Sequence, residues 1–358
     1  MSFRTTISYI LWPLTMWYAV GVAVRNLFYS IGVKRQAAPH ITTIGVGNLS
    51  IGGSGKTPMA EYLLELLGDS YRTAFLSRGY KRRSKGYASD DGTHNPQMLG
   101  DEPAMVAKKY PEVQVAVCEK RVEGVSRLMA QEEPPQVVVL DDVYQHRQIK
   151  PSINLLLTEY GHPFYRDHIL PYGNLREFRS ARSRASMVIV TKCPEKLNPV
   201  DKHNIVNDLR LQNFQKVFFS YLSYGDLITL DGQPAHLTPQ KTDHVLCLTG
   251  IAHPEPLVKH LSRQCKVQHL AYADHHAFSR REITHIRSTF EAIDAAKKYI
   301  ITTEKDAIRL EGLLEGLPVY VLPVKMKFHP DNDMDFDQIV SSAVRENISF
   351  LSKLSIWS

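Results

Sequence analysis

Cysteine is scarce in this sequence of 358 residues, and low-complexity stretches are missing. The four cysteines lie far apart and form no C-x-x-C pair: Cys118, Cys193, Cys247 and Cys265. A zinc site or a disulfide framework needs closer, paired spacing, so both are excluded, and free thiols in a reducing compartment are expected. With 43% hydrophobic and 22% charged residues, the composition is that of a folded protein, which argues against disorder.

The net charge of +6 favours an acidic partner, which leaves a phosphate ligand, nucleic acid or an anionic membrane surface open. The basic residues form no patch interleaved with aromatics and match no motif that reads nucleic acid. Nucleic acid is therefore not an expected partner. Nothing in the composition indicates an obligate protein partner either.

Charged residues are absent from Ile7 to Val24, where aromatic residues such as Trp12 and Trp17 lie among aliphatic ones. This is about the minimum length of a spanning helix, and no small-residue cleavage site follows it. Three interpretations stay open: a helix in the membrane interface, a true span, and a buried core helix. We expect a membrane-associated helix over residues 1–35, with basic residues at the head groups: Arg4, Arg25, Lys34 and Arg35.

Short β-branched runs alternate with helical stretches downstream of Pro39, which predicts a doubly wound α/β sheet. Runs such as Val137–Leu140 are apolar on both faces, as expected of parallel strands covered by helices. Turn signals interrupt this rhythm after residue 217, and a second α/β pattern begins near His244. The expected division is a nucleotide-binding domain (36–216), a β linker (217–242), a smaller α/β domain (243–330) and a C-terminal amphipathic helix (331–358).

Glycine is concentrated in one turn between the first expected strand, Ile41–Val46, and a helix at Met59–Leu67. The segment Gly47-Asn48-Leu49-Ser50-Ile51-Gly52-Gly53-Ser54-Gly55-Lys56-Thr57 has the context of a P-loop, although Ser50 stands where the strict motif has glycine. Backbone N–H groups and the helix N-terminus would hold phosphates, Lys56 would reach the β- and γ-phosphates, and Thr57 would bind Mg²⁺. The predicted ATP-binding residues are Asn48, Gly52, Gly53, Ser54, Gly55, Lys56 and Thr57.

Two acidic residues, Asp141 and Asp142, directly follow the apolar run Val137–Leu140. Carboxylates at the carboxyl edge of a parallel strand lie near the phosphates of a P-loop and can hold Mg²⁺ directly or through water. Both aspartates are therefore predicted metal ligands, and the sequence does not decide which one contacts the ion.

Two large P-loop classes lack their signatures here. Switch GTPases read guanine with the aspartate of N/T-K-x-D, but Thr191-Lys192-Cys193 is followed by Pro194. Partitioning and arsenite-type ATPases carry a lysine before the paired glycines, where this chain has Ile51. A kinase or kinase-like transferase is the remaining interpretation.

Seven segments in order give a specific resemblance. They are 47–58, Ser77-Arg78-Gly79-Tyr80, Gly100-Asp101-Glu102-Pro103, Asp141-Asp142-x-x-Gln145-His146, Leu175-Arg176-Glu177, Asp274-His275-His276-x-Phe278 and Thr303-Glu304-Lys305-Asp306. Together they resemble the tetraacyldisaccharide 4'-kinase family of lipid A synthesis. The resemblance implies two α/β/α domains joined by a β linker, catalysis in the cleft between them, and phosphorylation of the 4'-hydroxyl of a tetraacylated disaccharide 1-phosphate by ATP. It places the reaction at the cytoplasmic face of the bacterial inner membrane.

The chain departs from the family pattern at two places. Val143-Tyr144 stands where the family has G-F, and Pro171-Tyr172-Gly173-Asn174 replaces P-A-G-P before the L-R-E segment. The second departure puts local substrate contacts in question.

An acceptor hydroxyl needs help in losing its proton, so a carboxylate or a carboxylate–histidine pair is expected near the γ-phosphate. Asp101 is the candidate base, although Asp-Glu-Pro also suits a helix N-cap. The resemblance assigns catalysis to Asp101 and His275, which act alongside Lys56. His276 has no metal-ligand spacing around it.

Guanidinium groups suit phosphate recognition, so Arg78, Arg121 and Arg176, with His146, are candidates for the disaccharide and its 1-phosphate. The matched motifs add Ser77, Glu102, Gln145 and Glu177 as expected substrate contacts. The basic loop at 81–85 is either a solvated loop or a contact with anionic lipid. Two other functions stay open: a membrane-attached ATPase coupled to a partner, which needs neither Asp101 nor His275, and a soluble small-molecule kinase, which does not need residues 1–25.

Overall fold

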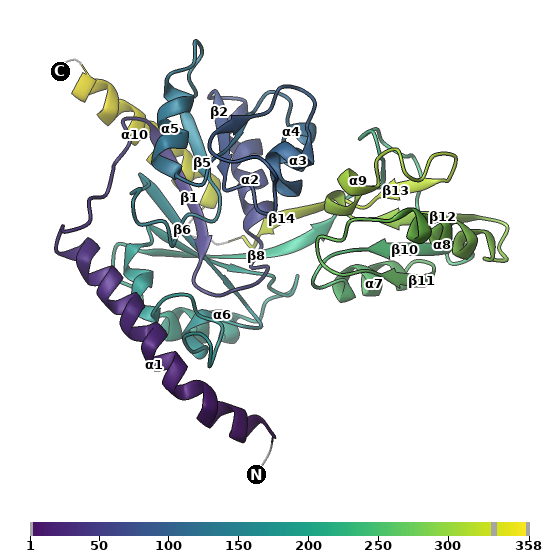
Figure 1. Ribbon diagram of the computed structural model, residues 1–358, viewed down its shortest axis with the longest axis horizontal. Helices are drawn as coiled ribbons and strands as arrows, with labels where there is room; N and C mark the ends of the chain where they lie inside the picture. The colour runs from purple at the N-terminus through teal and green to yellow at the C-terminus, as the bar shows by residue number, and fades with distance from the viewer. Residues whose placement is uncertain (1–2, 331–334, 356–358) are drawn as a thin grey trace.

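The computed structural model describes residues 3–330 and 335–355 (Figure 1). A large sheet has the strand order β14-β8-β7-β6-β1-β5-β2-β4-β3. Its strands are parallel except at the edges, where β3 and β14 run antiparallel to their neighbours. Their bounds are β1 Thr42–Asn48, β2 Thr73–Ser77, β3 Ala88–Ser89, β4 Gln114–Val117, β5 Val137–Leu140, β6 Ile153–Glu159, β7 Met187–Thr191, β8 Lys216–Tyr224 and β14 Val324–Phe328.

Helices cover both faces of this sheet, because alternate residues of its strands are apolar on either side. Helices α2 (Lys56–Gly68), α4 (Asp101–Lys109) and α10 (Phe336–Ser355) share one core with residues such as Val139 and Leu155. Helices α5 (Arg121–Met129) and α6 (Pro199–Leu209) cover the other face, against Val138 and Val188. The predicted doubly wound sheet is confirmed. The range 331–358, expected to be helical, contains α10, whose buried apolar residues belong to this core. Shorter elements are α3 Pro96–Leu99, η1 Phe164–Arg166 and η2 Arg179–Arg184.

A smaller sheet has the order β11-β10-β12-β13-β9 and is parallel except for β9. Its strands are β9 Ile228–Thr229, β10 His244–Thr249, β11 Lys266–Ala271, β12 Lys298–Thr302 and β13 Val319–Val321. Helices α7 (Glu255–Ser262), α8 (Arg280–Glu291) and α9 (Glu304–Leu310) pack on it. The predicted second α/β unit is therefore present.

The two sheets divide the chain differently from the ranges drawn from the sequence. The first part of the expected linker, from residue 217, belongs to β8 of the large sheet, and Ile228–Thr229 belongs to the smaller one. Residues 324–328, expected in the second domain, form β14 and pair with β8. The smaller sheet is thus inserted between β8 and β14, which Figure 1 shows running side by side between the two units.

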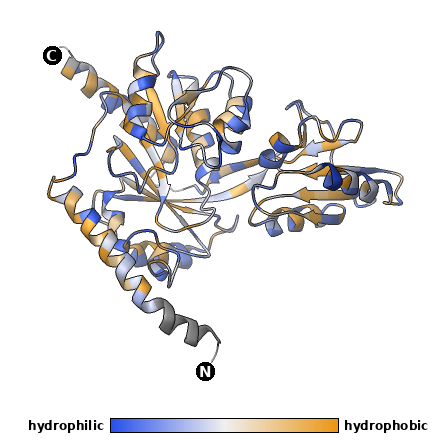
Figure 2. Cartoon of the chain, in the orientation of Figure 1, coloured by the Kyte–Doolittle hydropathy of each residue, from blue (hydrophilic) through white to orange (hydrophobic). Residues whose placement is uncertain are grey.

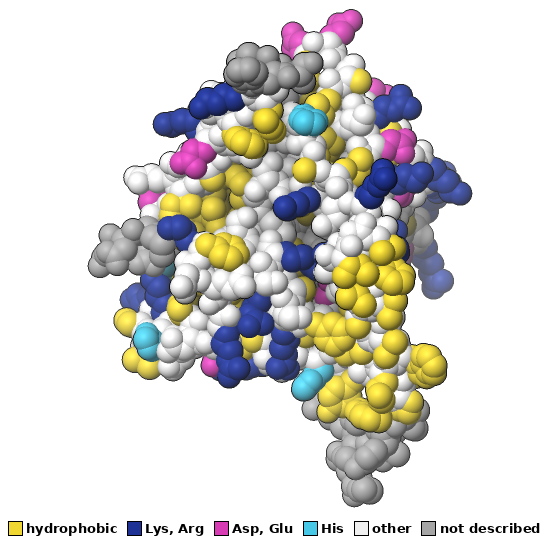
Figure 3. Space-filling model, turned by 90° about the vertical axis from the view of Figure 1, so that its left-hand side faces the viewer, with side chains coloured by type: hydrophobic (Ala, Val, Ile, Leu, Met, Phe, Trp, Pro, Cys, Tyr) yellow, Lys and Arg dark blue, Asp and Glu magenta, His cyan; other side chains and the backbone are white. Residues whose placement is uncertain are grey.

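Helix α1 (Phe3–Ser30) lies along the outside of the large unit (Figure 1). Trp12 and Trp17 are 59% and 78% exposed, and Val22 is buried. Apolar residues recur along the helix (Figure 2), and Figure 3 shows hydrophobic side chains gathered over it, with lysine and arginine side chains beside them. The buried-helix interpretation is therefore wrong. Among the residues that the structure describes, no helix has the length and apolar character needed to cross a membrane.

Candidate active site

The loop between β1 and α2 has the turn geometry of a phosphate-binding loop. Gly52 and Gly55 adopt φ of 110° and 83°, which favours glycine, and Gly55 is the N-cap of α2. Ser50 pairs with Leu175 in an antiparallel bridge, and the Ile51 N–H donates to the Asn174 carbonyl at 2.8 Å. The loop is therefore extended at position 50, which explains why serine is tolerated where the strict motif has glycine.

Buried polar groups around this loop lack partners within the described part of the chain. They are the Asn48 side-chain N–H₂ and the Ser54 hydroxyl. Leaving a buried polar group without a partner costs about 1–3 kcal/mol. Lys56 bends back toward Asn48 Oδ1 at 3.3 Å and Asp142 Oδ1 at 3.5 Å. A bound phosphate would satisfy such groups, so the residues present fit a nucleotide.

Asp141 and Asp142 are adjacent in sequence but differ in environment. Asp141 is buried, accepts a hydrogen bond from the Ser77 hydroxyl at 3.1 Å, and keeps Oδ1 free of any partner among the described residues. Burial, together with the charges of Glu102 and Asp142, raises the pKa of Asp141 to about 6. Asp142 adopts φ of 45° and accepts hydrogen bonds from Arg176 at 3.1 and 3.3 Å.

The pKa of Asp142 moves the other way. Burial raises it, but the charges of Lys56 and Arg176 outweigh burial and hold the pKa below its usual value. The unpaired carboxylate oxygen of Asp141 is the kind of hard oxygen donor that Mg²⁺ accepts. No cluster of three or more histidine, cysteine or acidic residues that could hold a metal occurs in the described ranges.

Asp101 does not cap α4, because Gly100 is the N-cap and Asp101 is the first residue of the helix. The capping interpretation is wrong. The Asp101 carboxylate instead faces the smaller unit, where Oδ2 lies 3.0 Å from His275 Nδ1 and 3.2 Å from Arg309 Nε. His275 adopts φ of 59°, and its N–H donates to the Gly250 carbonyl at 3.2 Å. Two residues 174 positions apart are thus brought into hydrogen-bond contact.

His276 points into a separate cluster. Its Nε2 lies 2.9 Å from Glu282 at the start of α8, and its ring stacks on Tyr272. Its described contacts therefore stabilise the beginning of a helix.

Helix α9 supplies charged residues that the sequence reasoning missed. Lys305 pairs with Glu102, and Arg309 contacts both Asp101 and Asp306. Thr303 caps α9, since its hydroxyl accepts from the Asp306 N–H at 3.1 Å. The motif Thr303–Asp306 could have pointed to Arg309. Arg309 lies three positions beyond Asp306, and residues three apart share one face of a helix.

The predicted substrate residues gather at the carboxyl edge of the large sheet, in two kinds of environment. Gln145 donates to the Asn48 carbonyl at 2.7 Å and accepts from Arg176 at 3.2 Å. Arg121 is buried and donates to the backbone carbonyls of Cys118 and Asp141 at 2.6 and 2.9 Å. Arg121 thus holds the end of β5 in place, and burial lowers its pKa to about 10.

Arg78 and Arg121 lie near enough to His146 for their charges to act on it. Arg78 is exposed, so its guanidinium is open to a ligand. Burial, then the charges of Arg121 and Arg78, lower the pKa of His146 to about 4, so its imidazole is neutral at pH 7. This corner combines an exposed cation with a neutral hydrogen-bonding ring.

Glu177 is fully buried and bound by the protein itself. Arg184 donates to it at 2.9 and 3.2 Å, Asn26 donates at 3.2 Å, and Arg25 lies at 3.5 Å. The Tyr18 hydroxyl of α1 donates to the backbone carbonyl of the neighbouring Arg176 at 3.0 Å. The structure therefore uses Glu177 to attach α1 to the segment that carries Arg176.

Both departures from the family pattern are structurally accommodated. A Cβ on Gly47 would lie 2.6 Å from Tyr144, which packs into the core and donates to the Ala181 carbonyl at 2.8 Å. At the second departure, the Tyr172 N–H donates to the Thr15 hydroxyl at 3.2 Å and the Asn174 N–H donates to Asp167 Oδ1 at 3.2 Å.

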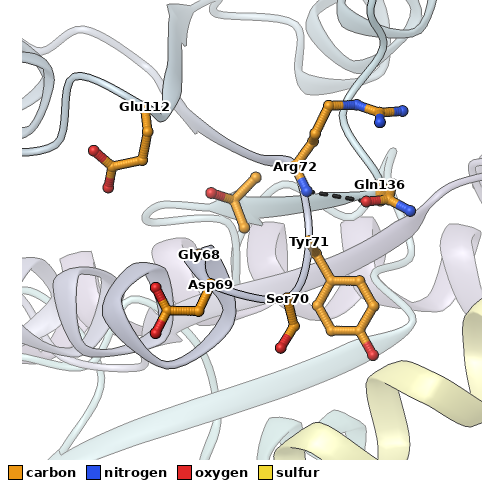
Figure 4. Close-up of a pocket in the computed structure, with 8 residues that line it drawn as sticks. Gly68, Asp69, Ser70, Tyr71, Arg72, Glu112 and Gln136 are labelled. Atoms are coloured by element: carbon orange, nitrogen blue, oxygen red, sulfur yellow. Dashed lines mark hydrogen bonds between the residues drawn. The ribbon is translucent and has the colours of Figure 1, made fainter.

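A hollow shown in Figure 4 lies away from these residues. It is lined by the end of α2 and the start of β2, with Glu112 and Gln136. Ser77 ends the same strand at its opposite, carboxyl edge. Ligands of open α/β sheets bind at carboxyl edges, so this hollow is not part of the site.

The fold and the arrangement of Lys56, Thr57, Asp141 and the Asp101–His275 pair define a P-loop phosphotransferase. A model of the family described as tetraacyldisaccharide-1-P 4'-kinase matches residues 7–345. The chain belongs to this family. A Bacteroides fragilis tetraacyldisaccharide 4'-kinase is 37% identical over 350 residues, which cover 94% of this chain and 93% of that protein. One from Flavobacterium psychrophilum is 40% identical over 339 residues, covering 94% and 97%.

A solved structure agrees with this assignment. The LpxK structure from Aquifex aeolicus in complex with ATP is similar with a TM-score of 0.75 at 27% identity, and the match covers 96% of this chain and 99% of that one. The family resemblance and the P-loop α/β fold predicted from the sequence are confirmed.

Proposed function

We propose that this chain transfers the γ-phosphate of ATP to the 4'-hydroxyl of a tetraacyldisaccharide 1-phosphate in lipid A synthesis. The observation that carries the proposal is the contact between Asp101 and His275, made across the two units beside the P-loop. Glu102, next to Asp101, lies near enough to Lys56 for the Lys56 charge to help lower the pKa of Glu102, and the charge of Glu102 helps raise the pKa of Asp141. The acceptor side and the nucleotide side thus lie close together.

The nucleotide side binds and neutralises phosphate. Lys56, which lies at Asn48 and Asp142, would contact the β- and γ-phosphates, and the loop from Gly52 to Gly55 would donate backbone N–H groups to them. Thr57, Asp141 and Asp142 would hold Mg²⁺, which supplies charge neutralisation on the transferring phosphoryl group. Asp141 is the candidate for direct contact, because Asp142 already accepts from Arg176.

The acceptor side removes a proton from the sugar hydroxyl. The Asp101–His275 pair receives it while the hydroxyl oxygen bonds to the γ-phosphorus. Arg78, Ser77, His146 and Glu102 are proposed to contact the disaccharide 1-phosphate. Arg121, Gln145 and Arg176 orient this surface through their bonds to the protein, and Glu177 acts through α1.

The lipid acceptor requires access to a membrane, and the exposed apolar side chains of α1 suit that role. We assign α1 to the interface at the cytoplasmic face of the inner membrane, where tryptophan and basic residues lie near head groups. Vesicles of anionic phospholipid should carry the wild-type chain upward in a flotation gradient. Recovery of the chain at the bottom would contradict this placement.

The test of the activity is transfer of labelled γ-phosphate from ATP with Mg²⁺ to a detergent-solubilised tetraacyldisaccharide 1-phosphate. We expect Asp101→Ala and His275→Ala each to lower kcat by roughly 10²- to 10⁴-fold, as for other acid–base residues. The matched control is Asp208→Ala, which removes an exposed carboxylate paired with Arg166. ATP hydrolysis without a lipid product would reject the kinase in favour of an ATPase coupled to a partner.

A further inference from the structure

Arg309 lies directly behind the Asp101–His275 pair. Its side chain is 9% exposed, and its Nε is 3.2 Å from Asp101 Oδ2, the same oxygen that contacts His275 Nδ1. Its Nη1 lies 3.3 Å from Asp306 Oδ1 and donates to the His276 carbonyl at 3.3 Å. One buried cation therefore joins the carboxylate of the large unit to the loop and helix of the smaller one.

Asp306 holds Arg309 from the other side. It is fully buried and accepts from the Gly250 N–H at 2.9 Å and from the Thr303 hydroxyl at 2.7 Å. Gly250 in turn accepts from the His275 N–H at 3.2 Å. A Cβ at Gly250 would lie 2.9 Å from Asp306 Oδ1, so this packing requires glycine. The backbone of His275 and the guanidinium of Arg309 thus rest on the same support.

Charges around Asp101 favour its anionic form. Burial raises the pKa of Asp101, but the hydrogen bond from His275 and the charges of Arg309, His275 and Lys305 outweigh burial and lower it. An anionic carboxylate accepts hydrogen bonds without donating any, so the proton of their shared bond belongs to His275 Nδ1. The lone pair of the imidazole is then on Nε2.

In the proposed kinase reaction the Asp101 carboxylate accepts from His275 Nδ1, and His275 Nε2 takes the proton of the acceptor hydroxyl. We propose that Arg309 is a positioning residue, supplied by the smaller unit, that holds the Asp101 carboxylate in place for this contact. This inference rests on the proposed kinase function and adds a residue to it. The hydroxyl proton moves to Nε2 and forms an imidazolium, which stays bonded to the Asp101 carboxylate. The hydroxyl oxygen bonds to the γ-phosphorus, the bond from phosphorus to the bridging oxygen breaks, and ADP leaves with that electron pair. The imidazolium then releases its proton to water.

The test compares Arg309→Met and Arg309→Lys with Arg287→Met in the lipid kinase assay. Arg287 is a matched control, since it lies in the same unit and donates to the backbone carbonyls of Leu313 and Glu315. We expect Arg309→Met to lower kcat by about 10- to 100-fold, the usual cost of losing a group that orients another. The KM for ATP should stay within twofold, and Arg309→Lys should fall between the two.

Two further readouts separate positioning from folding. Guanidinium chloride at about 20 mM should restore part of the activity of Arg309→Met, relative to equal sodium chloride, by refilling the missing group. Asp101→Asn combined with Arg309→Met should be no slower than Asp101→Asn alone, because Arg309 acts through Asp101. Losses that multiply, or the absence of rescue, would overturn the inference.

Two further outcomes distinguish a failure of the proposed kinase function from a failure of the inference about Arg309. A wild-type chain that makes no phosphorylated lipid would overturn the proposed function and this inference with it. An active wild type, with Arg309→Met as fast as Arg287→Met, would overturn the inference alone.

Discussion

The two sides of the proposed active site, the nucleotide side and the acceptor side, are built in different ways. The nucleotide side comes from two short segments, the loop from Gly47 to Thr57 and the end of β5, whose register within one sheet places them together. The acceptor side joins Asp101 of one unit to His275 and Arg309 of the other, across 174 positions in the first case. The nucleotide side is formed by residues that are close in sequence. The acceptor side forms only where two separately packed units meet.

The meeting surface between the units is charged. Lys305 pairs with Glu102, Lys109 bridges Glu61 of α2 and Glu304 of α9, and Lys108 reaches Glu311. Charged contacts of this kind are weakened by salt. Beside them, Ile308 of α9 packs against the hydrophobic core of the large unit. The nucleotide side therefore has a fixed geometry, and the acceptor side depends on how closely the units approach.

The largest expected effect breaks the nucleotide side alone. Lys56→Met removes the cation aimed at the phosphates, so we expect kcat to fall by roughly 10²- to 10³-fold, the usual loss for one charge-stabilising group. ATP binding should weaken while binding of the lipid is kept. Calorimetric titration of each ligand separates the two, with exposed Lys353→Met on α10 as the control. Equal loss of both affinities would show that the sides are not independent.

The next effect tests whether α1 belongs with the acceptor side. Glu177→Gln keeps the shape of the side chain but leaves Arg25 and Arg184 without their counter-charge, which loosens α1 and the segment that carries Arg176. We expect the KM for the lipid to rise about 10-fold, equivalent to roughly 1.4 kcal/mol, and the KM for ATP to stay unchanged. Asp208→Asn, which breaks an exposed pair, should change neither constant. A rise in the KM for ATP instead would attach Glu177 to the nucleotide side.

The smallest expected effect concerns the contact between the two units, where Lys109 pairs with both Glu61 and Glu304. Burial raises the pKa of Glu61 to about 7, and the opposing charge of Lys109 does not cancel this. Because the folded-state pKa exceeds the ordinary value of 4.5, the folded chain holds this proton more tightly, and stability is lost as pH rises from about 4.5 through 7. Glu61→Gln removes this dependence. Urea unfolding at pH 5 and pH 7.5 should show the wild type losing stability relative to the variant; a constant difference would contradict the assignment.

The sequence predicted the nucleotide side because its signals are local. The glycine spacing, Lys56-Thr57 and the acids after an apolar strand each depend on neighbours within a few residues. Asp101 and His275 came from family resemblance, since Asp-Glu-Pro alone also fits a helix cap. The structure excludes the cap, because Gly100 holds that position, and the catalytic role of Asp101 stays a prediction.

Other features could not be read from the sequence because they depend on distant partners. Glu177 looked like a ligand contact within an L-R-E segment, and its burial is set by Arg25 and Arg184. Val324–Phe328 has a strand-like pattern that does not say which sheet it joins. Arg309 is one helical turn from a noticed motif, and its role needs the position of another unit.

The insertion of the smaller sheet between β8 and β14 also has a consequence for synthesis. A ribosome releases β8 long before β14, with about a hundred residues between them, so the outer edge of β8 waits unpaired while the inserted unit is made. Unpaired strand edges invite association with other chains. The large sheet is completed by β14, and covered by α10, only when the last part of the chain emerges. Nascent chains stalled before residue 324 should therefore be the ones that need chaperones.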